Sequence, residues 1–300
     1  MEALRNLTAK DFDQSPLGKI YSVNQADPLT KACDILRDNN IHSIPVYSSE
    51  DPKFLVGMID VLDIVSFISA KVAPGEFERA AHTIEFKKAT VGQVADRAER
   101  SPYLPVSENT PMQDIIDLLG ACGFHRCLVH NAADELSNII TQTAIVKFLV
   151  KHKDELGEVA EKTVAQLTLG SAPVYSVDIS APVKEAFQYL REKRVYGVAV
   201  TSKETRGAIV TVFSAKDARF IFRNLSRARY LSLPMSEYLS AMRIEDNPVN
   251  IKTLAITCKN TDTLSIVLQK FATSSVHRIY VVNEQNQPIT VITLTDALNA

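Results

Sequence analysis

Residues 262–282, DTLSIVLQKFATSSVHRIYVV, decide the fold of this chain. Four apolar residues within this stretch lie at i, i+3, i+4 and i+7, the spacing that places side chains on one face of an α-helix. They are Leu264, Val267, Leu268 and Phe271. Further on, Ile279 and Val281 alternate with other residues as in a β-strand. The stretch therefore predicts an amphipathic helix followed by a strand.

The same pattern occurs three more times in the chain. Apolar stripes with identical spacing begin at Leu29, Met112 and Val183, and alternating apolar residues stand 15 and 17 residues after each start. A short strand is expected six residues before each stripe, at Val23, Val106, Val177 and Cys258. After each alternating pair of apolar residues, the sequence predicts a further strand and a second helix. These further strands are expected at 55–59, 138–141, 208–213 and 289–293. The sequence therefore predicts four copies of a β-α-β-β-α unit and an α/β (α+β) fold.

The four copies are expected to form two modules. A unit of this size is marginal alone, so neighbouring copies should pair and bury their sheet faces against one another. The copies span about residues 18–70, 100–152, 171–224 and 251–300. A charged run at 151–155 lies between the second and third copies, which predicts modules of residues 1–157 and 158–300.

Composition excludes several classes of protein. The net charge of -2 argues against a broad cationic surface for nucleic acid or anionic lipid. Only 10 glycines occur in 300 residues, and neither glycine-rich phosphate-binding motif is present. No apolar run reaches the roughly 18 residues of a membrane span, and no secretory leader opens the chain. The four cysteines lack C-x-x-C spacing and predict reduced, mostly buried thiols, as in a cytoplasmic or nuclear protein without metal.

Histidine recurs 13 residues after the start of three of the four stripes. These residues are His42, His125 and His277, and arginine follows twice, as Arg126 and Arg278. Both side chains donate hydrogen bonds to phosphate, arginine through a bidentate fork. A lone dyad would more often pair with a nearby carboxylate, but recurrence in register favours a phosphate site.

A second recurring motif, [ST]-x-x-D, opens the last helix of two copies. It occurs as Ser214 with Asp217 and as Thr293 with Asp296. Such a motif is typical of a helix capping box. A carboxylate that accepts hydrogen bonds from two hydroxyl groups can also bind ribose. Aspartate for ribose, with histidine and arginine for phosphate, would form a nucleotide site without a glycine loop.

An enzyme is the alternative from another class. His125 and Arg126 precede Cys127, and both can lower the pKa of a thiol. Cys127 occupies the apolar position filled by Ile44, Val198 and Ile279 in the other copies, which favours a buried hydrophobic role. The catalytic motifs of hydrolases, kinases and zinc proteases are absent from the sequence. The sequence therefore favours a protein with no catalytic residue.

These residues resemble tandem cystathionine-β-synthase (CBS) domains, in particular the four-copy gamma subunits of the AMP-activated protein kinase family. The resemblance covers nearly the whole chain. It rests on the segments 54–59, 125–126, 145–149, 195–217, 276–282 and 293–298. The family implies two Bateman modules that form a flat disc and bind AMP, ADP or ATP.

The resemblance also assigns roles to individual residues. It implies ribose ligands at Asp217, Asp296, Thr293, Ser214 and Asp63, and phosphate ligands at His125, Arg126, Lys147, His277, Arg278 and His42. Three copies depart from the pattern. The first has Asp60 where Ser or Thr is expected, the second has Ala144 in place of the aspartate, and the third has Tyr196-Gly197 in place of a basic dyad.

The function implied is a non-catalytic regulatory subunit that binds adenine nucleotides and modulates a serine/threonine kinase. The expected partners are a catalytic alpha subunit and a beta scaffold subunit, with neither nucleic acid nor membrane. The alternative is a gamma-like CBS-domain scaffold with few or no working nucleotide sites and other partners.

Overall fold

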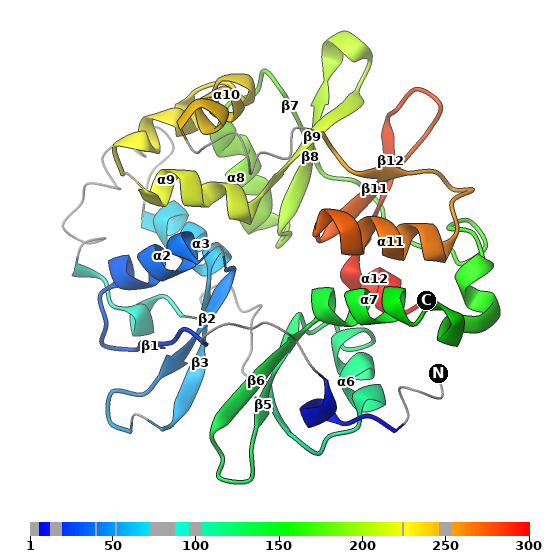
Figure 1. Cartoon of the computed structure of the whole chain (residues 1–300). Helices are drawn as coiled ribbons and strands as arrows, with labels where there is room; N and C mark the ends of the chain where they lie inside the picture. The colour runs from blue at the N-terminus through cyan, green and yellow to red at the C-terminus, as the bar shows by residue number, and fades with distance from the viewer. Residues whose placement is uncertain are drawn as a thin grey trace. The chain divides into compact units, whose positions relative to one another are not determined.

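The structure is a computed structural model of the chain (Figure 1). It describes residues 6–12, 20–39, 41–51, 53–71, 88–95, 104–223, 225–245 and 254–300. Within these ranges the four predicted copies of β-α-β-β-α are all present. Their strands are β1 Val23–Asn24, β2 Ser43–Tyr47, β3 Leu55–Asp60, β4 Pro105–Ser107, β5 Arg126–His130, β6 Leu136–Thr141, β7 Ser176–Asp178, β8 Gly197–Ser202, β9 Ala208–Ser214, β10 Thr257–Cys258, β11 Arg278–Val282 and β12 Pro288–Thr293.

Each copy folds its strands into one three-stranded sheet. The first strand runs parallel to the middle strand, and the third strand runs antiparallel to it, in the orders β1-β2-β3, β4-β5-β6, β7-β8-β9 and β10-β11-β12. The long connection between the two parallel strands is the amphipathic helix, as parallel pairing requires. The predicted strand positions are confirmed, and each third strand ends at the residue that caps the next helix.

The helices that join the first and middle strands are the predicted amphipathic ones. They are α2 Leu29–Asp38, α6 Met112–Leu119, α8 Val183–Glu192 and α11 Leu264–Ser274. Every residue of the four apolar stripes is buried except Ile116, which is half-buried. Burial of one such side chain contributes about 1.5–3 kcal/mol, so the stripes hold each helix on its sheet.

The final helix of each copy begins directly after the third strand. These helices are α3 Val61–Lys71, α7 Gln142–Lys151, α12 Leu294–Leu298 and, in the third copy, the 3₁₀ turn Ala215–Ala218 continued by α9 Arg219–Arg223. A further helix, α10 Met235–Glu245, follows the third copy, and 3₁₀ helices lie at Ala9–Asp11, Val91–Gln93, Lys153–Glu161, Lys203–Thr205 and Leu225–Ser232.

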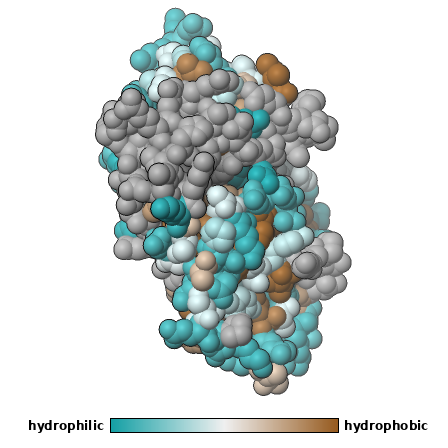
Figure 2. All heavy atoms as spheres, turned by 90° about the vertical axis from the view of Figure 1, so that its left-hand side faces the viewer, coloured by the Kyte–Doolittle hydropathy of each residue, from teal (hydrophilic) through white to brown (hydrophobic). Residues whose placement is uncertain are grey.

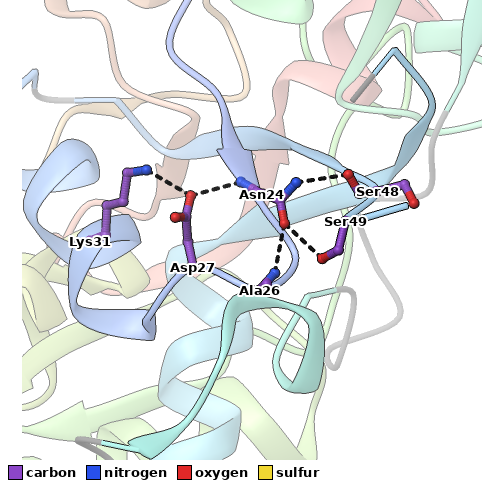
Figure 3. A network of polar contacts seen from close by, with 6 residues as sticks. All are labelled: Asn24, Ala26, Asp27, Lys31, Ser48 and Ser49. Atoms are coloured by element: carbon purple, nitrogen blue, oxygen red, sulfur yellow. Dashed lines mark hydrogen bonds and ion pairs between the residues drawn. The ribbon is translucent and has the colours of Figure 1, made fainter. Parts of the chain in front are cut away.

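Side-chain hydrogen bonds hold the tight turn between the first strand and its helix. In the first copy, Asn24 Nδ2 donates to the Ser48 carbonyl at 2.7 Å, and Asn24 Oδ1 accepts from the Ala26 amide and the Ser49 hydroxyl (Figure 3). The Asn24 amide and the Lys31 ammonium both donate to Asp27 Oδ2 at 2.8 Å. The turn is thereby fixed at the end of the sheet opposite to the final helix.

The chain divides into two compact units that combine segments distant in sequence. One unit contains Met1–Ile20, Tyr103–Val174 and Ala255–Ala300, and the other contains Tyr21–Pro102 and Tyr175–Leu254. The first unit therefore holds the second and fourth copies, where α7 packs against α11 and α12. The second unit holds the first and third copies, where α3 packs against α8 and α2 against α9.

This grouping differs from the expected pairing of consecutive copies, because helix contacts join copies that are not neighbours in sequence. The proposed modules, residues 1–157 and 158–300, stay a prediction. In the second unit, buried side chains of both copies share one hydrophobic core that includes Ile44, Val65, Phe187 and Phe213. In the first unit, buried residues gather around α6 in one cluster and around α11 in another.

Exposed hydrophobic side chains are scattered over the described surface. Figure 2 shows one face, on which hydrophobic residues form separate brown spots among hydrophilic teal ones. Among the largest exposures are those of Ile244 and Phe54, with 82% and 61% of their surface accessible. None of the helices in the described ranges is both long and apolar enough to cross a membrane.

Candidate functional site

The strand register brings the recurring dyads beside the capping residues of the final helices. In every sheet the first residue of the paired middle strand lies opposite the last residue of the third strand. These pairs are Ser43 with Asp60, Arg126 with Thr141, Gly197 with Ser214, and Arg278 with Thr293. Directly opposed residues project their side chains on the same face of a sheet. Arg278 is therefore a neighbour of the turn that carries Asp296.

The Asp296 turn is a complete capping box at the start of α12. The Thr293 amide and hydroxyl donate to Asp296 Oδ2 at 2.7 and 2.6 Å, and the Asp296 amide donates back to Thr293 Oγ1 at 3.3 Å. The carboxylate is half-buried. Within the part of the chain that the structure describes, its second oxygen, Oδ1, accepts no hydrogen bond and can accept one from a ligand hydroxyl.

The Asp217 turn in the third copy has similar geometry but a different setting. The Ser214 amide and hydroxyl donate to Asp217 Oδ2 at 2.6 and 2.9 Å. Burial raises the pKa of the Asp217 carboxyl above its usual value of 3.8, although the Ser214 hydrogen bonds act in the opposite direction. The Tyr238 hydroxyl donates to the Asp217 carbonyl at 2.7 Å and anchors the turn to α10. The Asp217 carboxylate is thus held in place by hydrogen bonds, but its burial removes water from the charged form.

We expect this raised pKa to appear in the pH dependence of stability. Because the folded state holds the Asp217 proton more tightly than the unfolded state, ionisation destabilises the fold as the pH rises from 3.8 through the folded pKa. The Asp217→Asn variant lacks this penalty. The free energy of unfolding of the wild type minus that of the variant should therefore fall over this pH range and then level off, as measured by urea denaturation.

Asp178 provides a control of opposite sign. Hydrogen bonds from Ser180 lower the pKa of the Asp178 carboxyl, so its ionisation stabilises the fold. The free energy of unfolding of the wild type minus that of Asp178→Asn should therefore rise with pH and level off above 3.8. A difference for Asp217→Asn that stayed constant or rose with pH would contradict the assignment.

In the first copy the corresponding turn is closed by a second carboxylate. Asp60 and Asp63 are only 3% and 1% exposed. The Asp60 amide donates to Asp63 Oδ2 at 2.8 Å, and the Asp63 amide donates to Asp60 Oδ1 at 2.9 Å. The Tyr196 hydroxyl of the third copy donates to Asp60 Oδ2 at 3.2 Å. Asp63 therefore occupies the capping position, but its side chain lies in the interior of this unit.

In the second copy Thr141 caps α7 by accepting from the Ala144 amide at 3.3 Å. No carboxylate stands at position 144, as the sequence indicates. The His125 carbonyl accepts from the Gln142 amide at 3.2 Å, which holds the dyad at the start of α7. Gln142 also donates through Nε2 to Thr295 Oγ1 at 2.8 Å, beside Asp296. The second copy thus contacts the Asp296 turn within one unit.

The predicted ligands of the second and fourth copies lie in one unit. The structure brings Arg278, Thr293 and Asp296 together on one sheet, with exposed His277 adjacent to Arg278. Gln142 donates hydrogen bonds both to the His125 carbonyl and to Thr295, so it links the His125-Arg126 dyad to the Asp296 turn. Lys147 is exposed and lies more than one turn into α7 from Thr141, and among the described residues it forms no hydrogen bond or ion pair with Asp296.

The remaining predicted ligands lie in the other unit. His42 is half-buried, and its carbonyl accepts from the Val61 amide at 3.2 Å at the start of α3. His42 belongs to the first copy, in which Asp60 and Asp63 are buried. Ser214 and Asp217 belong to the third copy. The roles of all these residues as nucleotide ligands stay predictions. Sequence reasoning missed Gln142 and Thr295, although a polar residue at the usually apolar first helical position was a visible signal for Gln142.

Two hollows of the described surface lie away from these turns. One, of about 400 Å³, is lined by Tyr230, Ser236, Glu237, Ser240, Ala241 and Ile244. The other, of about 240 Å³, is lined by Pro105, Val106, Ser107, His130, Asn131 and Asp134. None of the predicted nucleotide ligands lines either hollow, so the candidate site is defined by register and capping geometry. No group of three or more His, Cys, Asp or Glu residues in the described ranges is placed to hold a metal ion.

Cys127 is a buried core residue. It is fully buried in β5, and burial raises the pKa of its thiol to about 12. Burial likewise raises the thiol pKa of Cys33 to about 12 and that of Cys258 to about 11. Cys122 is exposed. A thiol with a pKa this high stays protonated at neutral pH, and the thiolate is the nucleophile.

We therefore expect one of the four thiols to react quickly with a disulfide reagent in the native protein. Cys122 should react within minutes at pH 8, and the other three should react only after denaturation, as followed by absorbance of the released thiolate. In the Cys122→Ser variant the fast phase should disappear. Rapid reaction of Cys127 in the native variant, identified by mass spectrometry, would contradict its buried role.

Comparison with known proteins identifies CBS domains in part of the chain. The CBS-domain model matches residues 9–70 and 249–300, which include the first and fourth copies. The gamma subunit of the 5'-AMP-activated protein kinase of Dictyostelium discoideum is 26% identical over 300 residues, 96% of this chain and 50% of the relative. Residues 9–70 and 249–300 of this chain therefore match CBS domains, and the chain is similar in sequence to a kinase gamma subunit.

Two further comparisons give a second similar relative and a solved structure with the same fold. An Arabidopsis thaliana protein named SNF1-related protein kinase regulatory subunit gamma-1-like is 25% identical over 71% of this chain and 49% of the relative. The chain thus spans about half the length of the first curated relatives it matches. The solved structure of protein MJ1225 from Methanocaldococcus jannaschii has the same fold, with a TM-score of 0.75 and 17% identity over 97% of this chain and 99% of that chain.

Proposed function

We propose that this CBS-domain protein is a non-catalytic regulatory subunit that binds adenine nucleotides and modulates a partner serine/threonine kinase. The kinase assignment is supported by the gamma-subunit relatives. The nucleotide assignment is supported by the geometry of the fourth copy. Cytoplasmic or nuclear localisation forms part of the same proposal.

The observation that carries the nucleotide assignment is the pairing of Arg278 with Thr293 across β11 and β12. It places a guanidinium on the same sheet face as the capping turn of Asp296. Oδ1 of Asp296 can accept a hydrogen bond from a ribose hydroxyl, and the Arg278 guanidinium can donate hydrogen bonds to a phosphate. One end of a single sheet thus offers complementary groups for both parts of a nucleotide.

The second copy supplies a further basic dyad to the same unit. Arg126 is the first residue of β5 and His125 directly precedes it, and Gln142 donates a hydrogen bond to Thr295 beside Asp296. We propose that these side chains extend the phosphate-binding region of the Asp296 site. Two basic dyads in one unit of a protein with a net charge of -2 fit recognition of a small anion rather than a polyanion.

The Asp296 turn is the strongest of the proposed nucleotide sites. The first copy buries Asp63 against Asp60, and the second has Ala144 where a carboxylate is required. The third has Asp217 but no basic dyad at Tyr196-Gly197. These departures support the second candidate function, a gamma-like scaffold with few working sites.

Two experiments test the proposal. Isothermal titration calorimetry of the full chain with AMP, ADP and ATP should show binding, and absence of heat at millimolar nucleotide with a folded protein would overturn the nucleotide assignment. Pull-down with kinase alpha and beta subunits should recover both. Nucleotide binding without recovery of either subunit would favour the scaffold with other partners.

A further inference from the structure

Gln142 is a polar residue at a position that the other copies fill with apolar side chains. It is the first residue of the final helix, where the other copies have Val61, Ala215 and Leu294, all buried. Gln142 is itself only 5% exposed. A buried amide destabilises a fold unless its hydrogen bonds are satisfied, so this substitution requires a compensating interaction.

Both amide protons of Gln142 are used. Its Nε2 donates to the Leu119 carbonyl at the end of α6 and to Thr295 Oγ1 in α12, each at 2.8 Å. The Leu119 carbonyl is one of those that a helix leaves unpaired at its C-terminus. Gln142 therefore joins the end of one helix in the second copy to the first turn of a helix in the fourth copy.

A second contact ties α12 to the same place. Asn299 Nδ2 donates to the Gly120 carbonyl at 3.1 Å, directly after the Leu119 carbonyl that Gln142 occupies. A side chain at Gly120 would meet Asn299 Oδ1 at 2.9 Å, so the two segments approach closely. The short helix α12 is thus held at its first turn by Gln142 and at its end by Asn299.

The residue that Gln142 contacts lies inside the capping box. Thr295 stands between Thr293 and Asp296, the two residues whose hydrogen bonds define that turn. The backbone amide of Gln142 also donates to the His125 carbonyl, next to Arg126. One residue therefore connects the turn that holds the aspartate with the strand that holds the second basic dyad.

We propose that Gln142 is a positioning residue that fixes the Asp296 turn for ligand binding and couples it to the His125-Arg126 strand. The inference rests on the proposed nucleotide function. Gln142 itself need not touch the ligand. Its loss should weaken binding because the turn must then be ordered at the expense of binding free energy.

The test uses two variants that both remove the Gln142–Thr295 hydrogen bond, one from each side, and Gln142→Met also removes the bond to the Leu119 carbonyl. Gln142→Met keeps the length of the side chain, and Thr295→Val keeps the shape of threonine. Each should weaken AMP binding about three- to tenfold in calorimetry, the range expected for one neutral hydrogen bond. The double variant should bind AMP no more weakly than the weaker-binding single variant, because both single variants already remove the Gln142–Thr295 bond.

Controls separate this role from a general loss of stability. Gln166 caps an exposed turn of the same unit by accepting from the Thr163 amide at 2.8 Å, and Gln166→Met should leave AMP affinity unchanged. All variants are compared well below their thermal midpoints, with folding checked by circular dichroism. If Gln142→Met does not fold, the AMP affinity of Thr295→Val alone tests the positioning role of Gln142.

The outcomes distinguish the inference from the function on which it rests. Unchanged affinity in Thr295→Val and in a folded Gln142→Met, with normal binding by the wild type, overturns the inference and leaves the nucleotide assignment intact. Additive losses in the double variant also overturn it. Absence of binding by the wild type overturns the nucleotide assignment and the inference together.

Discussion

Replacement of Asp296 by alanine is expected to lower the affinity for AMP about 10- to 100-fold. Hydrogen bonds to a charged group contribute about 1.5–3 kcal/mol, and each 1.4 kcal/mol changes a dissociation constant tenfold. The half-buried carboxylate keeps Oδ1 available while Oδ2 accepts from Thr293. The measurement is calorimetric titration of the wild type and variant with AMP and with adenosine, both of which contain the ribose.

A matched control exists because the same unit contains a second capping box. The Thr8 amide and hydroxyl donate to Asp11 Oδ2 at 3.0 and 2.6 Å, as Thr293 does to Asp296. Asp11→Ala therefore removes an equivalent cap, worth about 1 kcal/mol of stability, without a basic dyad beside it. Equal losses of affinity in the two variants would show that Asp296 acts only as a cap.

Arg278→Ala tests the phosphate end of the same prediction. Loss of the guanidinium should weaken AMP binding by a similar factor but leave the affinity for adenosine, which lacks phosphate, nearly unchanged. Asp296→Ala should weaken both ligands. A loss of adenosine affinity in Arg278→Ala equal to that for AMP would contradict the placement of Arg278 at the phosphate.

Replacement of Phe213 by alanine is expected to lower the free energy of unfolding by about 3–5 kcal/mol, as found for large cavities in protein cores. Phe213 is fully buried in β9. Its ring lies 5.2 Å from that of Phe187 and 5.8 Å from that of Tyr238, in edge-to-face geometry. Its loss removes both aromatic pairs, and urea denaturation measures the change.

Phe54 is the control for that prediction. It is 61% exposed, so Phe54→Ala should change the free energy of unfolding by no more than about 0.5 kcal/mol. A loss below about 1 kcal/mol for Phe213→Ala would contradict the central place of Phe213 in the core shared by the first and third copies.

The elements of each copy could be predicted because their signals are local. The stripe of Leu264, Val267, Leu268 and Phe271 and its three equivalents predicted the helices, and all these residues except the half-buried Ile116 are buried as expected. The constant spacing between stripe and dyad predicted that Arg126 and Arg278 occupy equivalent places, and both begin the middle strand of their sheet.

The contacts between copies could not be predicted in the same way. Packing of α3 against α8 and of α7 against α11 depends on helix faces that meet only in the folded chain. The bond from Gln142 to Thr295 joins residues 153 positions apart, and no periodicity encodes it. The sequence showed that Asp60 was unusual, but not that its side chain would be buried together with that of Asp63.

A structure of the chain with bound AMP would decide whether the Asp296 turn is a nucleotide site. We expect the ribose hydroxyls at Asp296 Oδ1 and the phosphate within hydrogen-bond distance of Arg278. Asp63 should remain buried beside Asp60 and make no contact with a ribose. A ribose bound at Asp63 or Asp217 with the Asp296 turn unoccupied would contradict the account.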